Sequence, residues 1–156
     1  MENTRLESFK FPKEERLHHR SLVEGLFREG KSFYEFPFRV TWRKLSDEEF
    51  HKNFRDNPPE AIGNVQVLIT VPKKKRRKAV DRVLIRRRIR EAYRLNRIPL
   101  RSAFEDIKGL RHLAIALVYI HDKNLDYRYL EEKIKIIIGK LQSKIPGLSN
   151  CQASKS

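Results

Sequence analysis

Cysteine is almost absent from this chain of 156 residues, which contains only Cys151. A disulfide needs two cysteines and cysteine-based zinc sites need more, so both kinds of cross-link are excluded within this chain. The five histidines do not form a metal-binding pattern either, because the adjacent His18 and His19 would point about 100° apart on a helix. No metal site built from protein side chains is therefore predicted.

Long hydrophobic runs are also missing. The longest run, residues 113–120, is far shorter than the roughly 20 residues that a membrane-spanning helix needs. Residues 1–12 carry charges on both sides of Phe9 and Phe11, so they lack the apolar segment of a secretory signal peptide. We therefore expect a cytoplasmic protein that does not enter a membrane.

Negative charge is scarce, since 20 acidic residues stand against 35 lysines and arginines, for a formal net charge of +15. Self-repulsion at this charge destabilises a compact protein unless an anionic partner is near. Nucleic acid is the first candidate for that partner, and an anionic membrane surface is the second.

Hydrophobic periodicity divides the chain into alternating helices and strands. Helices are predicted over residues 14–28, 80–97, 100–108 and 126–145. Strands are predicted over residues 32–45, 65–71 and 112–120. This order is typical of helices packed on a small mixed sheet, so the predicted fold class is α+β, an α/β sandwich.

The remaining segments are predicted from composition. Residues 32–45 are predicted to form one or two short strands, with Pro37 at an edge, a bulge or a break. Residues 46–63 contain acids and prolines and are predicted to form a polar loop, and residues 146–156 a disordered tail. We expect a single domain over 1–156, with its core at about 14–145.

Positive charge is concentrated in one segment, residues 73–97, which holds thirteen basic and two acidic residues. When residues 80–97 are placed on a helix, all of its arginines except Arg88 fall within an arc of roughly 140°. The arginines of this arc are Arg82, Arg86, Arg87, Arg90, Arg94 and Arg97. The opposite arc carries Leu84, Ile85, Ile89, Ala92 and Leu95, with Arg88 as its one basic residue. Arginine suits bidentate phosphate contacts and stacking on unpaired bases, so the pattern favours RNA binding.

A basic segment also has other interpretations. A solvated surface or a nuclear-import signal would explain the lysines of 73–78, but neither needs an arginine face backed by an apolar one. A transcription-factor basic region would feed a dimerising zipper, and Pro99 interrupts the pattern instead. A helix-turn-helix fits badly with a helix between two strands. No DNA partner is expected.

The same stretch resembles the signature helix of the bacterial ribonuclease P protein component, with matches at 78–82 (KAVDR), 85–87 (IRR) and 90–94 (REAYR). The end of the first predicted helix and the strand before the lysines are also similar to that family. Val83 and Leu84 depart from it, because the family has asparagine and arginine there. Valine cannot make the polar contact of the asparagine.

The resemblance implies an αβββαβα sandwich with a left-handed βαβ crossover, against the usual right-handed rule. It implies that helix 80–97 docks on the catalytic RNA, and that a cleft between the first helix and the sheet holds the 5′ leader of precursor tRNA. Phe27 and Phe38 match positions in that cleft. The RNA-binding residues expected from the charge pattern and the resemblance are Lys73, Lys74, Lys78, Arg82, Arg86, Arg87, Arg90, Arg94 and Arg97.

No catalytic residues are predicted in the protein itself, because no histidine or acid has the spacing of an acid–base pair. The resemblance implies an endoribonuclease whose RNA subunit carries the catalysis and binds most of the Mg²⁺, with precursor tRNA as the substrate. The alternative is a structural RNA-binding protein, such as a ribosomal protein, which would explain the charge and the helix equally well.

Overall fold

The computed structural model describes residues 11–55 and 62–145. The predictions for the tail 146–156 and for Cys151 lie outside these residues. Along the chain the elements are the 3₁₀ turn η1 (Lys13–Glu15), α2 (Arg20–Glu29), β1 (Lys31–Glu35), β2 (Phe38–Ser46), α3 (Asp47–Asn53), β3 (Val65–Thr70), α4 (Ala79–Asn96), α5 (Ile98–Glu105), β4 (Leu110–Tyr119) and α6 (Tyr127–Lys144).

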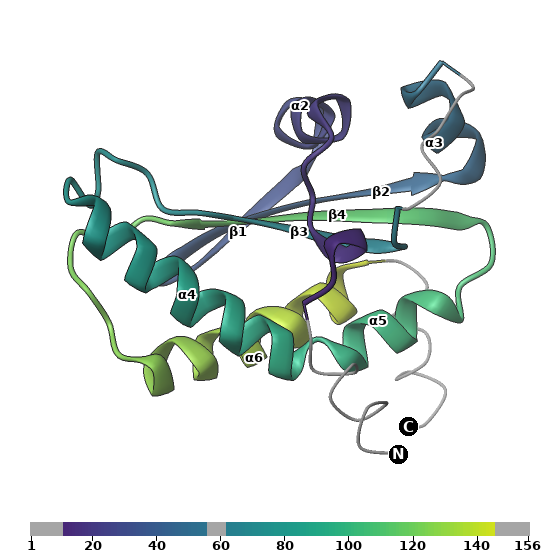
Figure 1. The fold of residues 1–156 in the computed structure, drawn as a ribbon. Coiled ribbons are helices and arrows are strands. Elements are labelled where there is room, and N and C mark those ends of the chain that lie inside the picture. Colours follow the sequence, from purple (N-terminus) through teal and green to yellow (C-terminus); the bar gives the residue numbers. More distant parts are fainter. Residues whose placement is uncertain (1–10, 56–61, 146–156) are drawn as a thin grey trace.

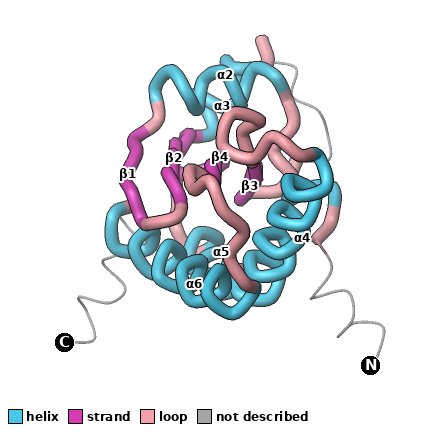
Figure 2. Tube along the Cα trace, turned by 90° about the vertical axis from the view of Figure 1, so that its left-hand side faces the viewer, coloured by secondary structure: helices cyan, strands magenta, loops and turns pink. Residues whose placement is uncertain are grey.

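The four described strands form one mixed sheet in the order β1-β2-β4-β3 (Figure 2). β1 pairs antiparallel with β2, and β2 antiparallel with β4, whereas β3 and β4 are parallel. A peptide bond in cis at Phe36-Pro37 lies in the turn between β1 and β2. Of the three alternatives for Pro37, an edge, a bulge or a break, the structure therefore shows the break, between two strands.

The chain crosses from β3 to β4 through α4 and α5. Figure 1 shows that both strands run in the same direction and that α4 and α5 lie on one face of the sheet, and Figure 2 shows the order of the strands. With α4 and α5 in front of the sheet and both strands pointing upward, β4 lies to the left of β3. The crossover is left-handed, which is uncommon because a right-twisted strand followed by a right-handed helix normally returns on the other side.

Helices cover both faces of the sheet, with α4, α5 and α6 on one face and α2 and α3 on the other (Figure 1). The larger core lies on the side of α4 and α6, where alternate β2 residues point inward: Phe38, Val40 and Trp42. β4 is buried on both faces, because Ala114 and Ala116 pack toward α2 and α3. This explains its nearly continuous apolar sequence.

Two predicted segments differ from the structure. The first helix begins at Arg20 rather than near residue 14, because residues around Arg16 are extended and form a bridge to Val67 of β3. The predicted loop 46–63 contains α3, whose start is fixed by a reciprocal hydrogen-bonded cap between Ser46 and Glu49. α3 packs on the sheet through Phe50, which is buried.

Within the described residues, no helix combines the length and the apolar character needed to cross a membrane.

Candidate nucleic-acid interface

α4 is amphipathic and is held from behind by apolar side chains. Ile85, Ile89, Ala92 and Tyr93 are buried, and the helix packs against α6 and β3. Leu95 was predicted on this buried arc, yet it is exposed and Tyr93 occupies the core instead. The prediction for the arc is therefore right in its centre and wrong in its last turn.

The middle of α4 carries three arginines that we call the arginine face: Arg86, Arg87 and Arg90. In the part of the chain that the structure describes, no carboxylate forms an ion pair with any of them. The pKa of Arg90 is lowered from its ordinary value, first by burial and then by the charges of Arg16, Arg86 and Arg87. An arginine stays charged despite such a shift, so this face is a concentrated positive surface.

The first turn of α4 is fixed to the loop before it. Arg82 donates hydrogen bonds to the carbonyl oxygens of Arg76 and Arg77, at 2.9 and 2.7 Å. Arg76 pairs with Asp81 at 2.9 Å, and Asn124 donates to the same carboxylate. Arg82 is therefore partly engaged in holding the loop, whose predicted RNA-binding lysines are exposed: Lys73, Lys74 and Lys78.

The last turn of α4 uses its arginines differently. Arg94 pairs with Glu91 of the same helix. Arg97 is only 1% exposed and donates to both carboxylate oxygens of Glu15, at 2.7 and 3.2 Å. A buried guanidinium cannot reach a phosphate, so the prediction that Arg97 contacts RNA is wrong.

Arg88, the basic residue on the apolar arc, donates to the carbonyl oxygen of Leu125 at 2.6 Å. This bond fixes the loop between β4 and α6 against α4. The residue is therefore compatible with the apolar side of the helix, because its charged end leaves the core at the edge.

Phe27 and Phe38, predicted to line one cleft, lie in different environments. Phe27 is 50% exposed on α2, whereas Phe38 is 0% exposed and packs against Tyr119 in the core beneath the sheet. The prediction for Phe38 is wrong, because the apolar face of β2 points toward α4 and α6 and away from α2.

The other face of β2 points toward α2 and was not identified as a site. Arg39 is exposed there, and Arg43 pairs with Glu29 of α2 at 2.7 Å. Tyr34 of β1 is directly opposite Arg39 in the register and therefore shares its side of the sheet. Tyr34 is 67% exposed. The alternation of basic and apolar residues in β2 was the signal that could have revealed this surface. We call Phe27, Tyr34 and Arg39 the open sheet face.

The described residues offer no protein site for a metal ion, because no group of three or more histidine, cysteine, aspartate or glutamate side chains gathers there. His112, the most buried histidine, shares a 2.9 Å hydrogen bond with Gln66. Burial, and then the charges of Arg111, His19 and Arg43, lower its pKa to about 3. It is therefore neutral near pH 7 and unsuited to proton transfer at that pH.

Comparison with known proteins places this geometry in a family. The profile of the family Ribonuclease P matches residues 11–142. Two ribonuclease P protein components, from two strains of Porphyromonas gingivalis, are 29% identical over 139 residues, covering 89% of this chain and 91% of the relatives.

Solved structures share the fold. The ribonuclease P protein of Staphylococcus aureus superposes with a TM-score of 0.58 at 17% identity, covering 83% of this chain and 96% of that one. The protein from Thermotoga maritima gives a TM-score of 0.54 at 22% identity, covering 81% and 96%. The alternative of a ribosomal-type protein is not favoured by these matches. The chain belongs to the ribonuclease P protein family and is the protein component of a ribonucleoprotein enzyme that has an RNA partner.

Proposed function

We propose that the arginine face, together with Lys73, Lys74 and Lys78, binds the catalytic ribonuclease P RNA. The observation that carries this proposal is the grouping of Arg86, Arg87 and Arg90 without a neutralising carboxylate among the described residues. A phosphate backbone that binds this cluster reduces the repulsion among its guanidinium groups. Binding also releases the counterions condensed on the RNA. If six phosphates were neutralised, the logarithm of the binding constant would fall with the logarithm of salt at a slope of about −5.

The open sheet face is the proposed contact for the 5′ leader of precursor tRNA. Phe27 and Tyr34 offer exposed aromatic rings on which unpaired bases stack, and Arg39 adds a cation for the backbone. The basic face of β2 takes the place that the sequence-based prediction gave to Phe38. The exposed Ser32 of β1 extends this polar surface along the sheet and shares a hydrogen bond with the buried Thr41 of β2.

Cleavage chemistry is assigned to the RNA. The protein residues that the structure describes do not fit a metal site, so we propose that Mg²⁺ is bound mainly by the RNA subunit. The protein then acts by reducing phosphate repulsion between the catalytic RNA and its substrate and by holding the leader. The enzyme would work in the cytoplasm as an endoribonuclease that matures tRNA 5′ ends.

Reconstitution tests this proposal. The protein is added to a bacterial ribonuclease P RNA at low Mg²⁺, and cleavage of precursor tRNA is measured with and without it. We expect clear stimulation, and tighter binding of precursor tRNA than of mature tRNA. Phe27→Ala should remove most of this leader preference, whereas Lys52→Ala on α3 should keep it. The absence of any stimulation would overturn the proposed function.

A further inference from the structure

The segment before α2 covers the outer edge of the sheet. The amide of Leu17 donates to the carbonyl oxygen of Val67 at 3.0 Å, and Arg16 forms a parallel bridge with the same residue of β3. The side chain of Gln66 donates to the carbonyl oxygen of Glu14 at 2.8 Å. β3 is an edge strand, so residues 11–17 protect hydrogen-bonding groups that would otherwise be open.

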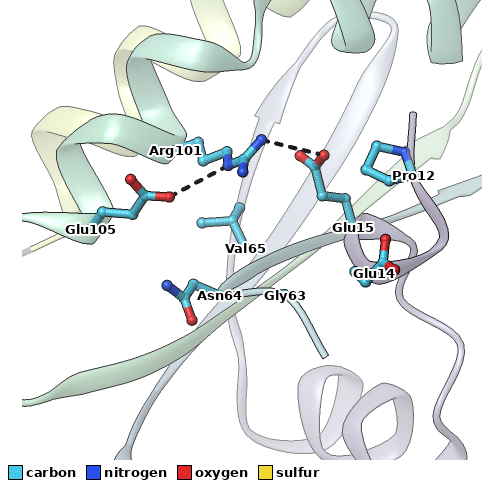
Figure 3. Close-up of a pocket in the computed structure, with 8 residues that line it drawn as sticks. All are labelled: Pro12, Glu14, Glu15, Gly63, Asn64, Val65, Arg101 and Glu105. Atoms are coloured by element: carbon cyan, nitrogen blue, oxygen red, sulfur yellow. Dashed lines mark ion pairs between the residues drawn. The ribbon is translucent and has the colours of Figure 1, made fainter. Parts of the chain in front are cut away.

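One carboxylate connects this segment to the far end of α4. Glu15 is buried and pairs with Arg97, which lies 82 positions later in the chain. Arg101 of α5 approaches the same carboxylate at 3.6 Å and also reaches Glu105 at 3.5 Å, as Figure 3 shows. Burial, and then the charge of Glu15, raise the pKa of Tyr93 above its ordinary value. The carboxylate therefore acts electrostatically on a residue of α4.

Beside this ion pair, η1 and α5 are separated by a pocket. The pocket has a volume of about 310 Å³ and is lined by Glu14, Glu15, Gly63, Asn64, Arg101 and Glu105 among others (Figure 3). Its acidic rim makes it a poor site for RNA. Across this gap, the Glu15 carboxylate links the segment to the end of α4 through Arg97 and to α5 through Arg101.

Arg16 is the residue that this link positions. It is exposed, and its guanidinium lies 5.5 Å from the centroid of the Phe11 ring and donates to the Phe11 carbonyl oxygen at 3.3 Å. Phe11 in turn lies 5.9 Å from the ring of Tyr93 on α4. These contacts bring Arg16 beside α4, close enough for its charge to lower the pKa of Arg90.

We infer that Arg16 is a further phosphate contact of the arginine face, and that the buried Glu15–Arg97 pair is the device that positions it. This inference rests on the proposed function, since it adds a residue to the same RNA-binding surface. Arg97 then serves RNA binding without touching RNA. It neutralises a carboxylate near the surface and fixes the segment from which a fourth guanidinium extends.

The first test measures affinity for an in vitro-transcribed bacterial ribonuclease P RNA at several salt concentrations. Arg16→Ala should weaken binding about fivefold at 0.15 M salt and reduce the salt slope by about one, as expected for one lost phosphate contact. Arg16→Lys should restore the slope. Lys52→Ala removes one charge from the opposite face of the sheet and should leave the slope unchanged. An Arg16→Ala protein that binds like the Lys52→Ala control overturns the inference.

The second test uses the sign of a charge change. Glu15→Gln makes the protein one charge more positive, so charge alone would strengthen RNA binding. Positioning predicts the reverse: binding weakens severalfold when Arg16 is present, and no further weakening occurs in the Arg16→Ala background. Stronger binding by folded Glu15→Gln overturns the positioning role. Circular dichroism checks whether Glu15→Gln folds. If it does not fold, the RNA affinity of Arg16→Ala still tests the phosphate contact, because Arg16 is exposed and its replacement should not unfold the protein.

The double variant Arg86→Ala/Arg90→Ala serves as the reference in both tests. If it binds RNA as tightly as the unaltered protein, the proposed function itself fails and the inference fails with it. If it loses affinity and Arg16→Ala does not, only the inference fails.

Discussion

The middle and the last turn of α4 contain the same residue type in two different states. Arg86, Arg87 and Arg90 lie together without a described carboxylate partner, whereas Arg94 pairs with Glu91 and Arg97 is buried against Glu15. A helical repeat of arginines is therefore not a uniform binding surface. The guanidinium groups in the middle are available to a polyanion, and the last one belongs to the folded structure.

Arg97→Ala should lower the free energy of unfolding far more than a substitution in the middle of α4. Removing Arg97 leaves the buried charge of Glu15 with only the longer contact to the half-exposed Arg101, so we expect a loss of about 3–5 kcal/mol in the free energy of unfolding. Arg87→Ala, on the exposed middle of the helix, should change it by less than about 0.5 kcal/mol. Urea unfolding followed by circular dichroism measures both. Equal stabilities of the two variants would show that the division of α4 is wrong.

The two phenylalanines extend the contrast between structural and binding residues to the sheet. Phe38→Ala should destabilise the protein by about 3–5 kcal/mol because the side chain is fully buried. Phe27→Ala should cost less than about 1 kcal/mol in stability and instead weaken binding of precursor tRNA by about 1–3 kcal/mol. Unfolding curves and substrate affinity separate the two effects. A Phe27 variant with unaltered affinity for precursor tRNA would remove it from the open sheet face.

His112 gives a pH-dependent form of the same contrast. Its pKa is lowered to about 3 in the folded protein, against an ordinary value of 6.5, so the unfolded chain binds the proton more readily. This contribution to stability is complete above about pH 6.5 and is lost as the pH falls toward 3. Between pH 7 and 5 we expect a loss of about 2 kcal/mol. His112→Gln should show a flatter dependence over this interval, and an identical slope would contradict the assignment.

Val83→Asn should have the smallest effect of these substitutions. Val83 lies on the exposed side of α4. Val83 is 44% exposed where the family has a polar residue. Asparagine should strengthen binding of the catalytic RNA by about 0.5–1.5 kcal/mol, roughly two- to tenfold, through one added hydrogen bond. Val80→Asn, at an exposed position one turn earlier, is the matched control and should not gain affinity. A gain at both positions would indicate a nonspecific effect of polarity.

Sequence patterns predicted those elements whose hydrophobic pattern lies within one short stretch of the chain. The helix at Ala79–Asn96 and the buried strand at Leu110–Tyr119 followed from periodicity and from a continuous apolar run. α3 was missed because its acidic residues suggested a loop, although Ser46 and Glu49 have the spacing of a capping box.

Long-range partners could not be read from the sequence. The roles of Arg97 and Glu15 depend on a contact across 82 positions, and the extended path around Arg16 depends on pairing with Val67. For β2, alternation identified two faces but not which of them would face α2. These errors concern which partner a side chain meets, because helical or strand periodicity describes only the element itself.

The salt dependence of RNA binding shows whether the middle of α4 contacts RNA. Arg86→Ala/Arg90→Ala should weaken binding of a bacterial ribonuclease P RNA roughly thirtyfold at 0.15 M salt and reduce the magnitude of the logarithmic salt slope by about two, while leaving the unfolding free energy nearly unchanged. An unaltered affinity together with an unaltered slope would show that the middle of α4 does not contact RNA.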